Sequence, residues 1–390
     1  MHLNKSTAAV HSGTIKDPQN RGILSPVFPG TSYEYLDTDK SVYPRYYNTP
    51  NQESVVKKLC ALEHGEDGLV FSSGMAAVVT TLLALLKAGD HAVFQGGIYG
   101  GTHHMVTAEF GGMGIEYSFT PTNDPADFEA AIRPETRLIY IETPSNPLLA
   151  LTDIAAIADL AKRKGLITVI DNTFASPVNQ NPIDLGIDVV LHSGTKYLSG
   201  HSDIICGAAI SSREIMAEIR SRSVNLGGTL NAQTCYLLER SLRTLVIRVE
   251  RQNQNALELA RFLARHEAIS AVNYPGLESH PDHVLAVQQM SGFGGMLSFE
   301  LKDLDVVAFQ QNLQLIHPAM SLGGVESIIC SPRMTSHAKL TAEARAAMGI
   351  SDQLLRFSVG IEDANDLIQD IQQAVEKTYQ SMTTGSFSGS

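Results

Sequence analysis

Cysteine is scarce in this chain: only four of the 390 residues carry a thiol. They lie far apart and form no Cys-x-x-Cys pair, so the sequence indicates neither a disulfide framework nor a zinc knuckle. Reduced thiols are typical of the cytoplasm, where we expect the protein to be located. Of the thirteen histidines only His103 and His104 are adjacent, and adjacent side chains rarely point the same way, so we predict no metal site. The four thiols belong to Cys60, Cys206, Cys235 and Cys330.

Excess positive charge and long apolar runs are missing too. The formal net charge is -12, which argues against a surface for nucleic acid or for an anionic membrane. The most apolar stretch, Ala76–Leu86, is too short to span a bilayer and contains Thr80 and Thr81. The first residues, MHLNKSTAAVHSG, lack the apolar core of a signal peptide. We therefore expect neither a nucleic acid nor a membrane as a partner.

The length of the chain predicts two domains, because a single core seldom organises so many residues. Residues 1–55 are rich in Pro, Gly, Ser and Tyr and show little periodicity, which predicts an extended arm lying on a neighbouring subunit. We predict a large domain at residues 56–245 and a small C-terminal domain at residues 246–380. The Ser/Gly-rich residues 381–390 are expected to form a disordered tail.

In the predicted large domain, strands alternate with helices. Arg137–Glu142 and Leu166–Asp171 have the apolar composition of buried strands. Asp153–Lys164, between them, has helical periodicity with Gly165 as a stop signal. This βαβ unit predicts an α/β fold with a mainly parallel sheet. Farther along we predict a long helix at Ala232–His266, strands at Met296–Leu301 and Leu354–Val359, and a terminal helix at Asp363–Tyr379.

The segment SGTKYLSGHSD, residues 193–203, carries the strongest chemical signal. Lys196 follows the apolar run 189–191 and is flanked by Ser193 and Thr195. Hydroxyl groups can bind phosphate oxygens, and a lysine amine can form a Schiff base with pyridoxal phosphate (PLP). A lysine just after a strand is, however, more often an ordinary solvated loop residue.

Asp171, at the end of a predicted strand, is a second candidate. Ligand sites in open α/β sheets collect at the carboxyl ends of strands. A carboxylate there can pair with the pyridine nitrogen of PLP and keep the ring protonated. The alternative is a cap or turn aspartate, since Asn172 and Thr173 follow it.

Two glycine-containing segments add a possible phosphate site and an aromatic ring. Residues 69–90 run from a short strand through Ser72-Ser73-Gly74 into a helix, whose N-terminus suits a phosphate. In GGIYGGT, residues 96–102, Tyr99 stands among four glycines and can stack on a planar cofactor. The alternatives are an ordinary capped helix and a surface tyrosine.

Taken in this order, these segments resemble the Cys/Met-metabolism PLP enzymes, the family of cystathionine lyases and synthases. The resemblance implies the aspartate-aminotransferase-like fold (fold type I) with a smaller α+β C-terminal domain. It also implies a homotetramer built from dimers with shared active sites. Other matching segments are TAAVHSGT (7–14), SPVFPGTSYEY (25–35), YPRYYNTPN (43–51), IETPSNP (141–147), SLGGVES (321–327) and LLRFSVGIED (354–363).

The resemblance also implies site roles. The catalytic residues are the Schiff-base lysine Lys196, the pyridine partner Asp171 and the stacking Tyr99. The cofactor phosphate is held by Gly74, Met75, Ser193 and Thr195, and by Tyr43 and Arg45 of the neighbouring subunit. The substrate α-carboxylate is bound by Arg356, helped by Asn146 and Ser327, while Glu326 binds a distal ammonium group.

Some positions depart from the family pattern. Val42 stands where many members that handle cystathionine have an acidic residue, and His103-His104 stands where many have an arginine. Asn48-Thr49-Pro50-Asn51 replaces the common Asn-Pro-Thr. The methionine γ-lyase pattern has a cysteine where this chain has Gly101, which makes that activity a weaker match.

The sequence therefore predicts a PLP-dependent lyase that cleaves the C–S bond of cystathionine or a related sulfur amino acid, with γ-elimination favoured. Cystathionine γ-synthase, O-acylhomoserine sulfhydrylase and cystathionine β-lyase activities remain open. Two readings from other classes are a binding protein with this fold and a Ser-x-x-Lys hydrolase using Ser193 and Lys196. The second leaves Asp171 and Tyr99 without a role.

Overall fold

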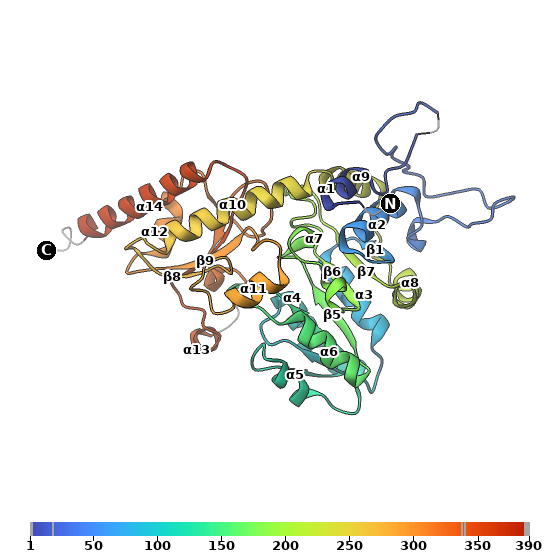
Figure 1. The fold of residues 1–390 in the computed structure, drawn as a ribbon, viewed down its shortest axis with the longest axis horizontal. Coiled ribbons are helices and arrows are strands. Elements are labelled where there is room, and N and C mark those ends of the chain that lie inside the picture. The colour runs from blue at the N-terminus through green and yellow to red at the C-terminus, as the bar shows by residue number, and fades with distance from the viewer. Residues whose placement is uncertain (1–2, 18, 337, 339–340, 386–390) are drawn as a thin grey trace. The chain divides into compact units, whose positions relative to one another are not determined.

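The computed structural model describes residues 3–17, 19–336, 338 and 341–385. The chain divides into two compact units, Met1–Thr143 with Thr152–Ile247, and Pro144–Leu151 with Arg248–Ser390 (Figure 1). The sequence had not predicted that residues 144–151 belong with the C-terminal part. The Leu151 N–H donates to Asp282 Oδ2 at 2.8 Å, which ties this segment to the second unit.

The first unit is built on a seven-stranded sheet among the described residues, in the order β1-β7-β6-β5-β4-β2-β3. Strand β7 runs antiparallel to both β1 and β6, and the other pairs are parallel, so the sheet is mainly parallel as predicted. Its strands are β1 (Asp67–Phe71), β2 (His91–Phe94), β3 (Glu116–Phe119), β4 (Thr136–Glu142), β5 (Ile167–Asp171), β6 (Val189–His192) and β7 (Gly207–Ser211).

Helices cover both faces of this sheet. Alternate residues of β4 enter different clusters: Leu138 packs in one with Leu82 of α3, and Ile139 in another with Ile157 of α6. Burying such a side chain contributes about 1.5–3 kcal/mol. The helices of this part are α1 (Lys5–His11), α2 (Pro50–Glu63), α3 (Gly74–Leu85), α4 (Gly100–Glu109), α5 (Pro125–Ala131), α6 (Ile154–Lys164), α7 (Ser176–Asn179), α8 (Arg213–Leu226) and α9 (Ala232–Leu242). Short 3-10 turns are η1 (Pro44–Tyr46), η2 (Gly111–Met113) and η3 (Pro182–Leu185).

Local signals explain where the central helix begins and ends. The Asp153 side chain accepts from the Ala156 N–H and caps α6 at its start. Gly165 ends the helix with a φ of 67°, a left-handed conformation that glycine adopts without strain. The predicted βαβ unit is therefore present, with boundaries within one residue of those expected.

The second unit contains a five-stranded sheet in the order β10-β11-β12-β9-β8 within the described part of the chain. Helices α10 and α14 pack on it through Leu259, Leu263 and Ile371, which share a cluster with Phe299 and Phe357. The elements are α10 (Leu245–Leu263), β8 (Ile269–Asn273), α11 (His283–Gln289), β9 (Met296–Leu301), α12 (Val306–Asn312), β10 (His317–Pro318), β11 (Ile328–Cys330), η4 (Pro332–Met334), α13 (Ala342–Ala347), β12 (Leu354–Ser358) and α14 (Ala364–Gly385).

Three expectations differ from the structure. The long helix at Ala232–His266 is two helices, because the Ser241 carbonyl accepts from the N–H and the hydroxyl of Thr244 and closes a tighter turn. The arm is less extended than predicted: α1 docks on α2, where Lys58 Nζ donates to the Ala9 carbonyl at 2.8 Å. Residues 381–385 belong to helix α14 rather than to a disordered tail, and 386–390 lie outside the described residues.

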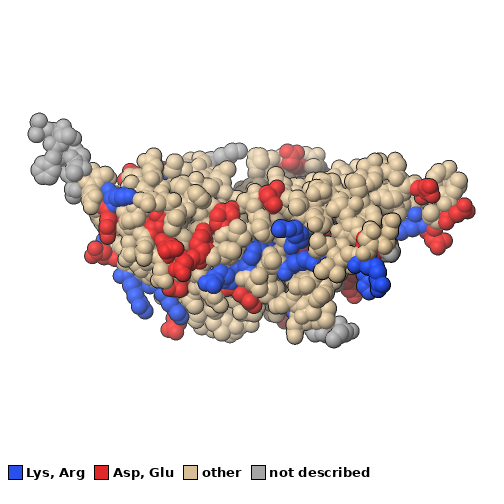
Figure 2. All heavy atoms as spheres, turned by 90° about the horizontal axis from the view of Figure 1, so that it is seen from above, with Lys and Arg blue, Asp and Glu red and all other residues tan. Residues whose placement is uncertain are grey.

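The surface carries both signs of charge. On the face drawn in Figure 2, Lys and Arg side chains lie next to Asp and Glu side chains. None of the helices in the described part of the chain is long and apolar enough to cross a membrane.

Candidate active site

The topology of the first sheet brings several predicted site residues to one edge. Strands β1, β2, β4, β5 and β6 point the same way, so their carboxyl ends share that edge. Asp171 ends β5, where it pairs in register with Glu142 of β4 and Leu191 of β6. This is the edge at which open α/β sheets bind their ligands.

Asp171 is anchored by its neighbour Thr173. Both the N–H and the hydroxyl of Thr173 donate to Asp171 Oδ1, at 3.0 and 2.5 Å, which leaves Oδ2 for another donor. Burial raises the pKa of the Asp171 carboxyl, and the Thr173 hydrogen bonds oppose that rise. Burial disfavours the charged form of this carboxylate, and a nearby cationic N–H group would compensate that cost. Asp171 is therefore well suited to pair with such a group.

Thr173 also links Asp171 to the lysine segment, because its Oγ1 accepts from the Ser193 N–H at 2.8 Å. Thr195 closes the base of the loop between β6 and β7: its N–H donates to the Cys206 carbonyl, and its Oγ1 accepts from the Cys206 N–H, both at 3.1 Å. Inside this loop the Lys196 N–H donates to the Ser193 carbonyl at 3.1 Å. The loop backbone that carries Lys196 is therefore held at both of its ends.

The start of α3 lies directly against Ser193. A Cβ atom added at Gly74 would come within 2.8 Å of Ser193 Cβ, so only glycine fits at this point. Ser73 caps the helix by accepting from the Ala76 N–H at 3.0 Å. The predicted phosphate residues Gly74 and Ser193 are thus brought together at a helix N-terminus, the arrangement that suits a phosphate.

Tyr99 lies on the loop that precedes α4, with 48% of its surface exposed. A Cβ atom added at Gly101 would approach Tyr99 Cε1 to 2.5 Å and Met75 Sδ to 3.2 Å, so these residues form one group. Sequence reasoning missed Glu142, whose Oε2 accepts from the Tyr99 N–H at 2.7 Å. The rule that singled out Asp171, a carboxylate at the end of a strand, would have found it.

Tyr43 and Arg45 lie at the start of turn η1. The Arg45 Nη1 donates to the Val224 carbonyl at 2.5 Å, and its guanidinium lies 5.8 and 5.5 Å from the ring centroids of Tyr43 and Tyr46. Both predicted residues are exposed. Their assignment to a neighbouring subunit's cofactor stays a prediction.

In the second unit, Arg356 and Asn146 are in contact. The buried Arg356 on β12 donates from Nη1 to Asn146 Oδ1 at 3.1 Å and from Nη2 to the Ser321 carbonyl at 3.0 Å. Two contacts hold the guanidinium plane, which leaves its further N–H groups as donors for a carboxylate.

Ser327, predicted to help bind the substrate, contacts Glu362 in the structure. Its hydroxyl donates to Glu362 Oε2 at 2.9 Å and accepts from the Gly360 N–H, and the residue is fully buried. The Ser327 hydroxyl proton is therefore already donated to Glu362, a residue that the sequence reasoning did not single out. Glu326 is half-buried beside it.

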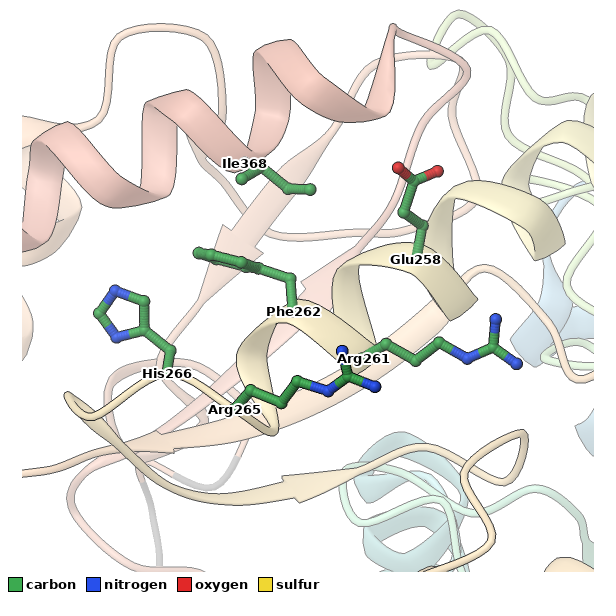
Figure 3. Close-up of a pocket in the computed structure, with 6 residues that line it drawn as sticks. All are labelled: Glu258, Arg261, Phe262, Arg265, His266 and Ile368. Carbon is green, nitrogen blue, oxygen red and sulfur yellow. The ribbon is translucent and has the colours of Figure 1, made fainter.

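A shallow pocket of about 390 Å³ lies between α10 and α14, where Phe262 points toward Ile368 (Figure 3). No predicted site residue lines it. Its lining residues are Glu258, Arg261, Phe262, Arg265, His266 and Ile368.

Among the described residues, no group of three or more His, Cys, Asp or Glu side chains could hold a metal ion.

The observed residues fit PLP: a helix start at Gly74 against a serine, a half-buried carboxylate with one oxygen available, and a lysine on a fixed loop. Fold and site define a PLP-dependent enzyme of fold type I.

Comparison with known proteins agrees. The chain is 42% identical to the cystathionine gamma-lyase of Bacillus subtilis, over 96% of this chain and 100% of that one. It is 41% identical to the cystathionine beta-lyase of Lactococcus lactis subsp. cremoris, over 95% and 98%. The crystal structure of cystathionine gamma-lyase from Lactobacillus plantarum complexed with L-serine matches with a TM-score of 0.92 and 37% identity, covering 97% of this chain and 100% of that one. Residues 6–376 match the Cys/Met metabolism PLP-dependent enzyme family, and the chain belongs to it.

Proposed function

We propose that this PLP-dependent carbon–sulfur lyase acts on cystathionine by γ-elimination, releasing cysteine, a four-carbon 2-keto acid and ammonia. The similarity to a cystathionine gamma-lyase over nearly the whole length of both chains carries this proposal. A 41% identical beta-lyase supports β-elimination as a second candidate. γ-Replacement, as in cystathionine γ-synthase or O-acylhomoserine sulfhydrylase, is the remaining alternative.

The residues of the first unit would bind and orient the cofactor. Bound PLP supplies an electron sink for a carbanion at the substrate Cα. Asp171 would pair with the ring nitrogen and Tyr99 would stack on the ring, while the Lys196 amine would accept the Cα proton and move it between carbons. Gly74, Met75, Ser193 and Thr195 would hold the phosphate.

The residues of the second unit would bind the amino acid. Arg356 binds the α-carboxylate with N–H groups that Asn146 and Ser321 do not use. Ser327 is not proposed as a direct ligand, because its hydroxyl is bonded to Glu362. Glu326 binds the distal ammonium group of cystathionine. Val42 cannot share this task, because its side chain carries no charge.

Two further predictions complete the proposal. Subunits assemble as a homotetramer in which Tyr43 and Arg45 reach the phosphate of a neighbouring subunit's cofactor. The protein works in the cytoplasm, where its thiols stay reduced.

The decisive experiment identifies the keto acid released from cystathionine by the purified enzyme. γ-Elimination breaks the bond between sulfur and the homocysteine-derived Cγ and yields 2-ketobutyrate with cysteine. β-Elimination breaks the other C–S bond and yields pyruvate with homocysteine. Pyruvate as the main product would overturn γ-elimination in favour of the second candidate. Turnover of an O-acylhomoserine with cysteine, without turnover of cystathionine, would overturn both lyase proposals.

A further inference from the structure

The buried carboxylate of Glu63 contacts sequence neighbours of the proposed cofactor residues. Glu63 is the last residue of α2 and has no exposed surface. Its Oε1 is the acceptor for two donors, His192 Nε2 at 2.5 Å and Asn172 Nδ2 at 2.9 Å. Its Oε2 has no hydrogen-bond partner among the described residues. A buried carboxylate is costly unless a charge or several donors compensate it.

The two donors are sequence neighbours of proposed cofactor residues. Asn172 directly follows Asp171 at the end of β5, and His192 directly precedes Ser193 at the end of β6. The Asn172 N–H donates to the Leu191 carbonyl at 2.9 Å, which extends the pairing of β5 and β6 beyond Asp171. One carboxylate oxygen therefore ties together the two strand ends at which the cofactor segments begin.

The charges around this link act on Asp171. Burial raises the pKa of the Asp171 carboxyl, whereas the Thr173 hydrogen bonds and a positive charge on His192 lower it. Lys5 of α1 interacts electrostatically with Glu63 and with Asp184 of η3. In the described part of the chain, Lys5 thus interacts with Glu63, Asp171 interacts with His192, and Lys5 interacts in addition with Asp184.

We propose that Glu63 and His192 are positioning residues: Glu63 holds the strand ends that carry Asp171 and Ser193, and stabilises a charge on His192 that keeps Asp171 ionised for the cofactor nitrogen. The inference rests on the PLP role proposed for Asp171. It assigns a task to a buried pair that touches neither substrate nor cofactor.

The variant Glu63→Gln separates charge from geometry. A glutamine Oε1 still accepts from Asn172 and His192, but the side chain is neutral. Enzyme stripped of PLP and titrated with it should show an affinity reduced ~3- to 10-fold, as for the loss of one charge-assisted contact. The pH midpoint of the visible absorbance of the lysine-bound cofactor should rise, because a ring nitrogen that has lost its proton no longer lowers the basicity of the nearby lysine nitrogen. Glu63→Ala, which loses both contacts, should bind PLP ~10- to 100-fold more weakly.

The matched control is Glu53→Gln, the same substitution on the same helix at the exposed partner of Lys40. It should leave both the PLP affinity and the pH midpoint as in the wild type. If Glu63→Gln only lowers the melting temperature of the PLP-free enzyme and changes neither quantity, the role is structural and the proposal is wrong. His192→Gln, which keeps an N–H donor without the charge, should give the same rise in midpoint. Failure of all these variants to fold would likewise indicate a purely structural role.

The proposed function is tested separately, by wild-type turnover. A wild-type enzyme that binds PLP but does not cleave cystathionine would contradict the substrate and leave this inference standing. Unchanged PLP binding in Glu63→Gln would contradict the positioning role of Glu63 and leave the proposed substrate standing.

Discussion

The ring of Tyr99 lies against the backbone of Gly101, so close that a methyl group at position 101 would meet Tyr99 Cε1 at 2.5 Å. Gly101→Ala should therefore rotate the ring away from its present position. Because aromatic stacking is worth about 0.5–1.5 kcal/mol, we expect PLP affinity to fall about 2- to 10-fold. Gly97→Ala is the control in the same loop, since a Cβ there has nothing within 4 Å. Equal effects of the two variants would contradict the stacking role of Tyr99.

Asp171→Asn should stabilise the PLP-free enzyme near neutral pH. The raised pKa of Asp171 means that the folded state binds its proton more tightly than the unfolded state. Stability is therefore lost as the pH rises from about 3.9, the unfolded value, through the folded value. Asparagine avoids this loss and still accepts from Thr173 through Oδ1.

The measurement is the melting temperature of the PLP-free variant and wild type from about pH 4 to pH 8, with the exposed Asp159→Asn as control. The difference between Asp171→Asn and the wild type should grow with pH. The same variant should bind and use PLP poorly. A melting temperature below that of the wild type at neutral pH would show that the charge of Asp171 stabilises the fold.

Lys196→Ala should abolish the visible absorbance of the lysine-bound cofactor while leaving the fold intact. The lysine supplies the covalent link, and the loop around it is held by Thr195 and Cys206 backbone contacts that the substitution does not touch. Circular dichroism in the far ultraviolet checks the fold. A borohydride-reducible adduct that persists on the variant would mean that another lysine holds the cofactor.

Arg45→Ala should weaken PLP retention by removing a guanidinium from a phosphate. If Arg45 serves a neighbouring subunit, mixing Arg45→Ala with Lys196→Ala should restore part of the activity. One site of a mixed dimer would then carry both native residues. Mixed dimers that are demonstrably formed and stay inactive would place Arg45 in the site of its own subunit.

Glu326→Ala tests the distal ammonium site. A partly exposed ion pair is worth about 1 kcal/mol, and up to about 3 kcal/mol when desolvated. We expect kcat/KM for cystathionine to fall roughly 5- to 100-fold, with much smaller losses for homocysteine or methionine. The exposed Glu278→Ala in the same unit is the control. Equal losses for both kinds of substrate would point to a structural or catalytic role instead.

Sequence reasoning worked where local periodicity and end signals decide the structure. The strand Met296–Leu301 has the predicted bounds, and Asp153 with Gly165 delimits α6 as expected. The break between α9 and α10 was missed because Arg243 and Thr244 are neither glycine nor proline. The break depends on hydrogen bonds to one carbonyl, that of Ser241, for which the sequence carries no separate signal.

Site prediction had the same limit. The carboxyl-end rule and the family motifs brought Asp171, Gly74 and Ser193 to one place, because strand direction fixes which ends meet. They could not reveal that Glu362 binds the Ser327 hydroxyl, or that Glu63 joins Asn172 to His192. Those contacts join residues 35 to 129 positions apart, so only the folded chain shows them.

The assignment of residues 144–151 to the second unit makes that unit discontinuous in sequence. A fragment beginning at Arg248 would lack Asn146 and Leu151, so Arg356 would lose an acceptor and Asp282 a donor. No single cut of the chain yields both units complete. Exchange of the C-terminal part at Arg248, or its expression alone, would therefore break the contact between Arg356 and Asn146. The second unit is transferred complete only when residues 144–151 accompany it.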